Sequence, residues 1–242
     1  MSVVASVPNR NVARPEYTIN KFRARRGLLL RQQIHALADY LGRDIVILDV
    51  GGKADYWANV GFDRIARIDV MNYDERALNR PIPEGMPAGI FTGKVGDARN
   101  LSEYADQSVD LAHSNSVIEH VGSWKDMRSM ASEMMRVGRS GWVQTPAWSF
   151  PMEPHFWAPF MHWFGAPMRA RMLSLSAFSH YRKLDLHRRR EQVEAINLLS
   201  KREVRTLFPE RTIYVERLIL AKSYTARWMP GGLQVSNRLR RR

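Results

Sequence analysis

Apolar residues recur at helical spacing in the first part of the chain and gather in short runs after it. Leu30, Ile34, Leu37 and Leu41 lie three or four residues apart, which predicts a helix over residues 21–41. Gly42 follows this helix and is typical of a helix end. We expect residues 1–20 to form a flexible N-terminal arm.

Five short apolar runs follow, separated by helix-forming or turn-forming segments. The strands predicted from these runs are Ile45–Val50, Ile65–Asp69, Ile90–Val95, Ser108–His113 and Gly141–Thr145. A short helix is expected over residues 55–61. Ser123, with Asp126 three residues on, is typical of a capping box and predicts a helix that ends at Gly138. This alternation predicts a doubly wound parallel sheet.

The rhythm breaks after the fifth strand. Residues 147–198 begin with seven large aromatic residues between Trp148 and Phe164 and continue with a basic helical stretch, so we predict an insertion there on the substrate side. A second capping box, Ser200 with Glu203, opens a helix that ends at Phe208. Two closing strands are then predicted over Ile213–Glu216 and Leu218–Lys222.

These elements predict an α/β fold class. We expect a Rossmann-like, doubly wound, mostly parallel seven-stranded sheet, with helices on both faces and an aromatic-rich insertion after strand 5. A single domain would span residues 21–228, and a basic C-terminal tail would span residues 229–242.

The cysteine content, the apolar runs and the net charge of the chain exclude some classes of function and favour others. The chain of 242 residues has no cysteine, which excludes disulfides, thiolate metal sites and cysteine nucleophiles. We find no signal-peptide pattern and no apolar run near the ~18 residues of a membrane span, and we expect a cytoplasmic protein. The net charge of +13 favours an anionic partner and leaves nucleic acid as an alternative, although no basic stripe is interleaved with aromatics.

Acidic residues and glycines stand where the predicted strands end. Asp49 ends the first strand before Gly51 and Gly52, Asp69 ends the second, and Asp97 follows the third. The carboxyl ends of parallel strands share one edge of a sheet, which is where α/β folds bind ligands. A glycine turn brings backbone N–H groups to an anion, and a carboxylate accepts from ribose hydroxyls or an adenine amino group.

Four motifs in order resemble those of class I S-adenosylmethionine-dependent methyltransferases, and the type 11 group in particular. They are Asp49-Val50-Gly51-Gly52, Ile68-Asp69, Gly96-Asp97-Ala98 and the run from Val109 to Val121 with Ser114-Asn115-Ser116-Val117-Ile118-Glu119-His120. The later segments Gln144-Thr145-Pro146 and Phe150-Pro151-Met152-Glu153-Pro154-His155-Phe156 also resemble that group. A third glycine of the fuller motif is missing, since Lys53-Ala54-Asp55 stands there.

The resemblance implies S-adenosyl-L-methionine as the cofactor and assigns residues to it. Asp49, Gly51 and Gly52 would hold its methionine end, and Asp69 its ribose. Asp97 and Ala98 would flank the adenine, while Ser114 and Asn115 would line the floor near the sulfonium. Trp57 is either a wall of this site or a core aromatic.

Methyl transfer from a sulfonium is an in-line displacement that needs alignment and a dry site, and a base where the acceptor carries a proton. Histidine suits this role near neutral pH. We predict His120 and His155 as catalytic residues, with Glu153 and His162 as weaker candidates. Glu153, His155 and His162 also carry metal-ligand atoms, but nothing supports a metal site and none is predicted.

The acceptor is expected to lie against the aromatic insertion. Its seven large aromatics, Trp148 to Phe164, are interpreted as the core of a lid, with sugar or base stacking and contact with a membrane interface as alternatives. Arg169, Arg171 and Arg188–Arg190 would suit an anionic acceptor. We therefore expect a small-molecule, glycan or lipid-linked acceptor, methylated at oxygen or nitrogen. The alternatives are a nucleic-acid methyltransferase and a methyltransferase-like binding protein without catalysis.

Overall fold

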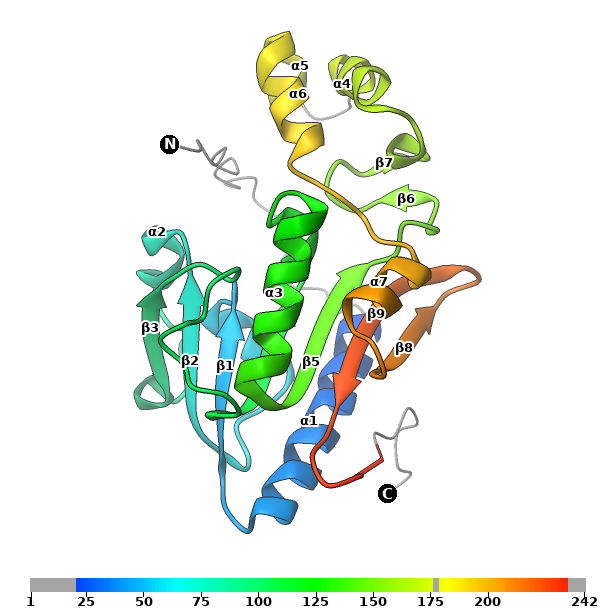
Figure 1. Ribbon diagram of the computed structural model, residues 1–242. Helices are drawn as coiled ribbons and strands as arrows, with labels where there is room; N and C mark the ends of the chain where they lie inside the picture. Colours follow the sequence, from blue (N-terminus) through cyan, green and yellow to red (C-terminus); the bar gives the residue numbers. More distant parts are fainter. Residues whose placement is uncertain (1–20, 176–178, 235–242) are drawn as a thin grey trace.

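The computed structural model describes residues 21–175 and 179–234. Within these residues the chain builds a seven-stranded sheet in the order β3-β2-β1-β4-β5-β9-β8 (Figure 1). Its strands are β1 (Ile45–Val50), β2 (Ile65–Asn72), β3 (Phe91–Val95), β4 (Val109–Asn115), β5 (Gly138–Pro146), β8 (Thr212–Arg217) and β9 (Ala221–Trp228). β1 to β5 pair in parallel, and β9 pairs antiparallel with both of its neighbours. The predicted fold class, a mostly parallel seven-stranded α/β sheet, is confirmed.

Helices cover both faces of the sheet (Figure 1). α1 (Lys21–Leu41) packs its apolar stripe on one face, and α3 (Trp124–Val137) and α7 (Lys201–Leu207) pack on the other. Successive residues of a strand point to opposite faces, so Ile47 of β1 joins the core under α1 and Leu48 joins the core under α3. Both capping boxes form as predicted, at Ser123 and at Ser200.

The remaining helices are short. They are α2 (Glu75–Leu78), α4 (Ala166–Ser174), α5 (Ser179–Arg182), α6 (Leu186–Glu194) and the 3-10 helices η1 (Ala54–Asn59), η2 (Ala88–Ile90), η3 (Ile118–His120) and η4 (Met161–Trp163). The helix expected over 55–61 is therefore a 3-10 helix. The connection from β3 to β4 has no helix in the structure, so strands and helices do not alternate at every step as the sequence suggests.

Residues 147–198 leave the sheet between β5 and α7 and extend beyond the end of β5 (Figure 1). They include the two-residue strands β6 (Met152–Glu153) and β7 (Ala158–Pro159), followed by α4 to α6. Part of this segment has its own small core. Its buried members are Phe156, Met161, Ala170, Leu173, Val193 and Ile196.

Two strand predictions need correction. β2 continues through Val70 and Met71 to Asn72, because these apolar residues pair in register with β1 and β3, so Asp69 lies inside the strand. The last strand begins at Ala221, because the apolar residues before it form the β8–β9 turn. Ile219 in this turn is 87% exposed.

None of the helices in the described part of the chain combines the length and apolar character that a membrane span needs. The predicted arm over residues 1–20 and the end of the predicted tail, residues 235–242, lie outside the described residues.

Candidate active site

The loop after β1 is built so that only glycine fits. Gly51 has φ +72°, and a Cβ atom there would lie 2.5 Å from Cγ2 of Val117. A Cβ atom on Gly52 would lie 1.8 Å from Oδ2 of Asp49. The N–H of Gly51 donates to the carbonyl oxygen of Met71 at 2.7 Å. The loop is thus held close both to β2 and to the segment after β4.

Asp49 supports this loop from below. Its carboxylate is fully buried, and Oδ2 accepts from Nε1 of Trp57 at 2.8 Å. Oδ1 lies 2.6 Å from Nδ1 of His113. Because both oxygens have protein partners, Asp49 is placed to position the loop rather than to present its charge to a ligand. Trp57 is a fully buried core aromatic that bonds to the site from behind.

Asp69 and Asn72 lie at different places on β2. Asp69 is three residues before the strand end and pairs with Arg67, whose Nε lies 2.8 Å from Oδ1. Asn72 ends the strand, and its Nδ2 donates to the carbonyl oxygen of Gly52 at 3.3 Å. Sequence reasoning missed Asn72, although the apolar pair after Asp69 is a signal that the strand continues. Asn72 is the polar side chain of β2 that lies against the glycine loop.

Asp97 and Ala98 follow β3. Arg99 grips the Asp97 carboxylate through Nε and a terminal nitrogen, the latter 2.7 Å from Oδ2, and this lowers the pKa of Asp97. The carboxylate is half exposed. Ala98 packs against the core under α3.

Ser114 and Asn115 end β4 and differ in their contacts. The Ser114 hydroxyl is buried and donates to the carbonyl oxygen of Val50 at 3.0 Å, so it ties β4 to β1. The side-chain oxygen of Asn115 is buried, and no donor among the described residues reaches it. An orphaned buried acceptor is uncommon and indicates a missing partner. Asn115 is therefore the better placed of the two to meet a ligand.

His120 and His155 come together, although 35 residues separate them. Their Nε2 atoms lie 3.0 Å apart. His155 Nδ1 is 2.7 Å from Oε1 of Glu153, and His120 Nδ1 is 3.3 Å from the carbonyl oxygen of Ala195. The cluster thus joins η3, the β6 turn and the chain that returns from α6. The sequence predicts both histidines but gives no sign that they touch.

Glu119 lies beside this pair and was not predicted as a site residue. It is fully buried, and Oε2 accepts from the Thr145 hydroxyl at 2.9 Å. Oε1 has no hydrogen-bond partner among the described residues. Burial raises the pKa of Glu119 to about 7, against the opposing charge effect of His155. One ligand-type atom from each of Glu119, His120 and His155 lies within 4.8 Å of the others.

The two weaker candidates, Glu153 and His162, have different partners. Glu153 belongs to the cluster through His155, whose backbone N–H also donates to its Oε2 at 2.8 Å. His162 bonds instead to the carbonyl oxygen of Trp148 through Nε2, at 2.8 Å, and burial lowers its pKa. Glu153, His155 and His162 therefore do not form one ligand set.

The aromatic segment is more open than a lid core. Phe156 is buried and Phe150 packs partly against the main core. Five of the seven aromatics are exposed over 43% of their surface or more, and Trp157 reaches 67%. These five are Trp148, Trp157, Phe160, Trp163 and Phe164. The lid-core interpretation is wrong for them, because they face solvent.

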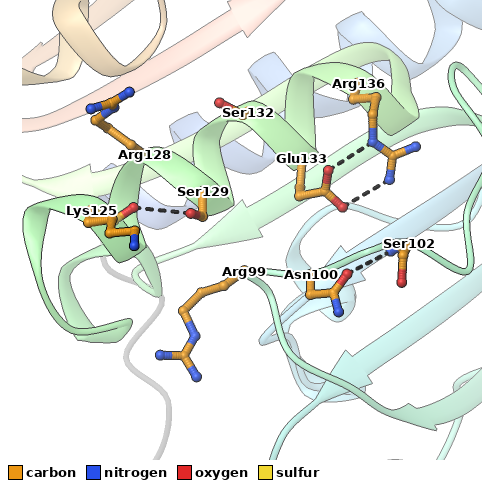
Figure 2. A pocket seen from close by; sticks show the side chains of 9 residues that line it. All are labelled: Arg99, Asn100, Ser102, Lys125, Arg128, Ser129, Ser132, Glu133 and Arg136. Carbon is orange, nitrogen blue, oxygen red and sulfur yellow. Dashed lines mark hydrogen bonds and ion pairs between the residues drawn. The ribbon is translucent and has the colours of Figure 1, made fainter.

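A separate basic hollow of about 760 Å³ lies between α3 and the loop after β3 (Figure 2). α3 supplies most of its lining, and Glu133 and Arg136 pair along that helix. None of the predicted site residues lines it. The hollow is polar and charged, unlike the mostly apolar clefts that enclose small ligands.

Comparison with known proteins identifies the central part of the chain. Residues 48–143, from β1 into β5, match the type 11 family model described as "Methyltransferase domain". This segment, which is less than half of the chain, is similar to a methyltransferase domain. No curated protein matches it in sequence.

Solved structures share the fold of this chain at low identity. The PH0226 protein of Pyrococcus horikoshii OT3 is 17% identical, with a TM-score of 0.51, over 89% of this chain and 93% of that chain. A possible exported protein of Bordetella parapertussis is 14% identical, with a TM-score of 0.51, over 84% and 68%. Monomeric WbdD is 15% identical, with a TM-score of 0.53, over 89% of this chain, which spans 44% of the WbdD chain.

Proposed function

We propose that this protein transfers a methyl group from S-adenosyl-L-methionine to an oxygen or nitrogen of a small-molecule, glycan or lipid-linked acceptor. The observation that carries the proposal is the meeting of two features at one sheet edge. Gly51 of the glycine loop lies against Val117, and Val117 is followed within three residues by Glu119 and His120. A cofactor loop and a proton-handling cluster therefore share one short segment.

The residues present fit the cofactor. The glycine loop presents backbone without side chains, because a Cβ atom there would collide with Val117 or Asp49, and the orphaned oxygen of Asn115 offers a buried acceptor at the end of β4, next to β5. We assign Gly51 and Gly52 to the methionine end of the cofactor and Asn72 to its ribose. Asp97 and Ala98 would flank the adenine. When bound, the cofactor supplies an activated methyl group, so the chain has to align the acceptor and exclude water.

The histidine pair handles the acceptor's proton in this proposal. The Glu153 carboxylate accepts from Nδ1 of His155, which turns the bare Nε2 of that ring toward His120. A ring nitrogen in this position can take a proton from an acceptor hydroxyl or ammonium group. General-base catalysis of this kind contributes about 10²–10⁴-fold.

Exposed aromatic surface beyond β5 supports a large acceptor with an apolar or sugar face. Trp157 and its exposed neighbours offer flat surface for stacking on a sugar or for peripheral contact with a membrane interface. The net charge of +13 favours an anionic acceptor. Nucleic acid is the less favoured acceptor, because the chain has no basic stripe interleaved with aromatics. A steep loss of affinity with added salt would point to a nucleic-acid complex instead.

Calorimetric titration with S-adenosylmethionine and S-adenosylhomocysteine tests the proposal. We expect micromolar binding to the wild type and at least about tenfold weaker binding to Asn72→Ala, a loss of about 1.4 kcal/mol. Asp69→Ala tests the ribose role that the resemblance implies, and we expect it to bind nearly as the wild type does. Exposed Asn79→Ala is the control. No binding to the wild type would favour a non-catalytic binding protein.

A further inference from the structure

The hydrogen bonds of His120 and His155 determine which of their ring nitrogens carry a hydrogen. A backbone carbonyl and a carboxylate only accept hydrogen bonds, so Nδ1 of His120 and Nδ1 of His155 both carry the N–H in these contacts. In neutral rings each Nε2 atom then carries a lone pair and no hydrogen. Those two lone pairs face each other at 3.0 Å. Two acceptors at this distance repel unless a proton or a metal cation lies between them.

Glu119 adds a third donor atom of the same kind. Its Oε1 is buried with no partner in the described chain, and one of its carboxylate oxygens lies within 4.8 Å of a nitrogen of each ring. A buried carboxylate oxygen without a hydrogen bond is costly, and a cation would satisfy it. One carboxylate and two imidazoles form the ligand set of many catalytic zinc sites and of non-haem iron sites.

The groups behind these ligands are those that metal sites use. A metal-bound histidine almost always donates its other N–H to a carboxylate or a backbone carbonyl, which fixes the ring and raises its basicity. Glu153 plays this part for His155, and the carbonyl of Ala195 plays it for His120. The Thr145 hydroxyl holds the other oxygen of Glu119. Each of the three side chains is thus held by a hydrogen bond on its other polar atom.

We propose that Glu119, His120 and His155 bind a divalent transition-metal cation, with Zn²⁺ as the first probe. Ligand atoms around zinc lie about 3.4 Å apart in a tetrahedron with bonds of about 2.05 Å. The two Nε2 atoms nearly meet this spacing, and one ligand atom of each residue lies within 4.8 Å of the others, so small side-chain movements would complete the set. Three protein ligands leave a position open for water or an acceptor oxygen.

This inference deepens the proposed function, on which it rests for the identity of the acceptor. An acceptor hydroxyl bound at the open position loses its proton more readily, because the cation stabilises the alkoxide. The site then favours methylation at oxygen. With the cation bound, the two Nε2 atoms are ligands and no longer bases, so the cation takes over the proton step assigned above to the histidine pair, and the proton leaves to water.

Metal binding is measured without cofactor or acceptor. Protein stripped with a chelator is titrated with Zn²⁺ by calorimetry, and Co²⁺ is added separately to record its visible absorption. We expect one ion per chain, a Co²⁺ spectrum with nitrogen and oxygen ligands, and a rise in Tm on loading. His120→Ala, His155→Ala and Glu119→Gln should each lose at least about 100-fold in affinity.

A variant behind the ligands separates this site from adventitious binding. Glu153→Gln keeps all three ligands and should weaken Zn²⁺ binding about 10–100-fold. His187→Ala, in an exposed position of α6, should bind as the wild type does. Circular dichroism identifies any variant that fails to fold. For a folded wild type, failure to bind Zn²⁺ or Co²⁺, or equal binding by the folded cluster variants, overturns the proposal. Titration of the same samples with S-adenosylhomocysteine reports separately on the proposed function.

Discussion

The indole N–H of Trp57 donates to the Asp49 carboxylate at 2.8 Å, in a place that solvent does not reach. The same carboxylate meets His113 on its other oxygen. η1 is thereby fastened to the first strand, immediately below the glycine loop. Trp57 therefore holds Asp49, and with it the glycine loop, in position from the buried side.

Trp57→Phe should destabilise the protein by about 2 kcal/mol, because the buried carboxylate loses a donor and the ring that replaces the indole is smaller. The free energy of unfolding, from urea titration at neutral pH, measures this. Trp124→Phe is the control, since that side chain is 40% exposed. Equal losses in the two variants would show that the hydrogen bond contributes nothing.

Gly52→Ala should weaken cofactor binding by at least about tenfold, or 1.4 kcal/mol. The added methyl group would lie 1.8 Å from an Asp49 oxygen that Trp57 holds in place, so the loop itself has to move. Calorimetry with S-adenosylhomocysteine checks the expectation. Gly89→Ala is the matched control, because a Cβ atom there meets nothing within 4 Å.

Glu133→Gln should remove about 1–2 kcal/mol of stability at pH 7 and less at pH 3. Arg136 and the N–H of Leu101 hold the Glu133 carboxylate and lower its pKa below the unfolded value. A carboxyl group with a depressed pKa stabilises the fold above its unfolded pKa, about 4.3, and that stability is lost as the pH falls through the folded pKa. Urea titrations of both proteins at the two pH values measure the difference.

The control for this pH dependence is Glu84→Gln, in an exposed loop. It should change the free energy of unfolding little at either pH. If Glu133→Gln lost as much stability at pH 3 as at pH 7, the loss would come from packing, and the ionic contribution would be refuted.

Gln33→Leu should cost about 2–4 kcal/mol, since several buried groups lose a partner at once. The Gln33 amide donates to the Ser140 hydroxyl and to the carbonyl oxygens of Gly141 and Trp228, and its own oxygen accepts from Arg227. Thermal or urea unfolding measures the loss. Gln192→Leu, on the partly exposed surface of α6, should change stability by less than about 0.5 kcal/mol.

Local signals in the sequence were sufficient where a single element decides the outcome. The helix over residues 21–41 and the first strand over Ile45–Val50 have the predicted bounds. Both capping boxes formed because their hydrogen bonds lie within four consecutive residues. The glycine loop and the two histidines could also be picked out, from their places after predicted strands and from the resemblance of their motifs to those of the methyltransferase group.

The remaining features depend on pairing and burial, which a single segment does not encode. Asp69 resembles a strand end, but register with both neighbours carries β2 on to Asn72. Leu218 and Ile219 form an apolar run that ends in a turn, whereas β9 continues to Trp228 and buries Arg227. Glu119 gives no sign in the sequence that Thr145 and two histidines will surround it. The roles of the cofactor residues stay predictions.

The link between Gln33 and Trp228 sets the order in which this domain can assemble during synthesis. These residues are 195 positions apart, yet β9 lies inside the sheet, between β5 and β8. Until the ribosome has released the last strand, α1 lacks the carbonyl of Trp228 and β5 lacks a neighbour on its open edge. A nascent chain therefore exposes an unpaired edge until β9 has been synthesised, and chaperones would be most needed in that interval.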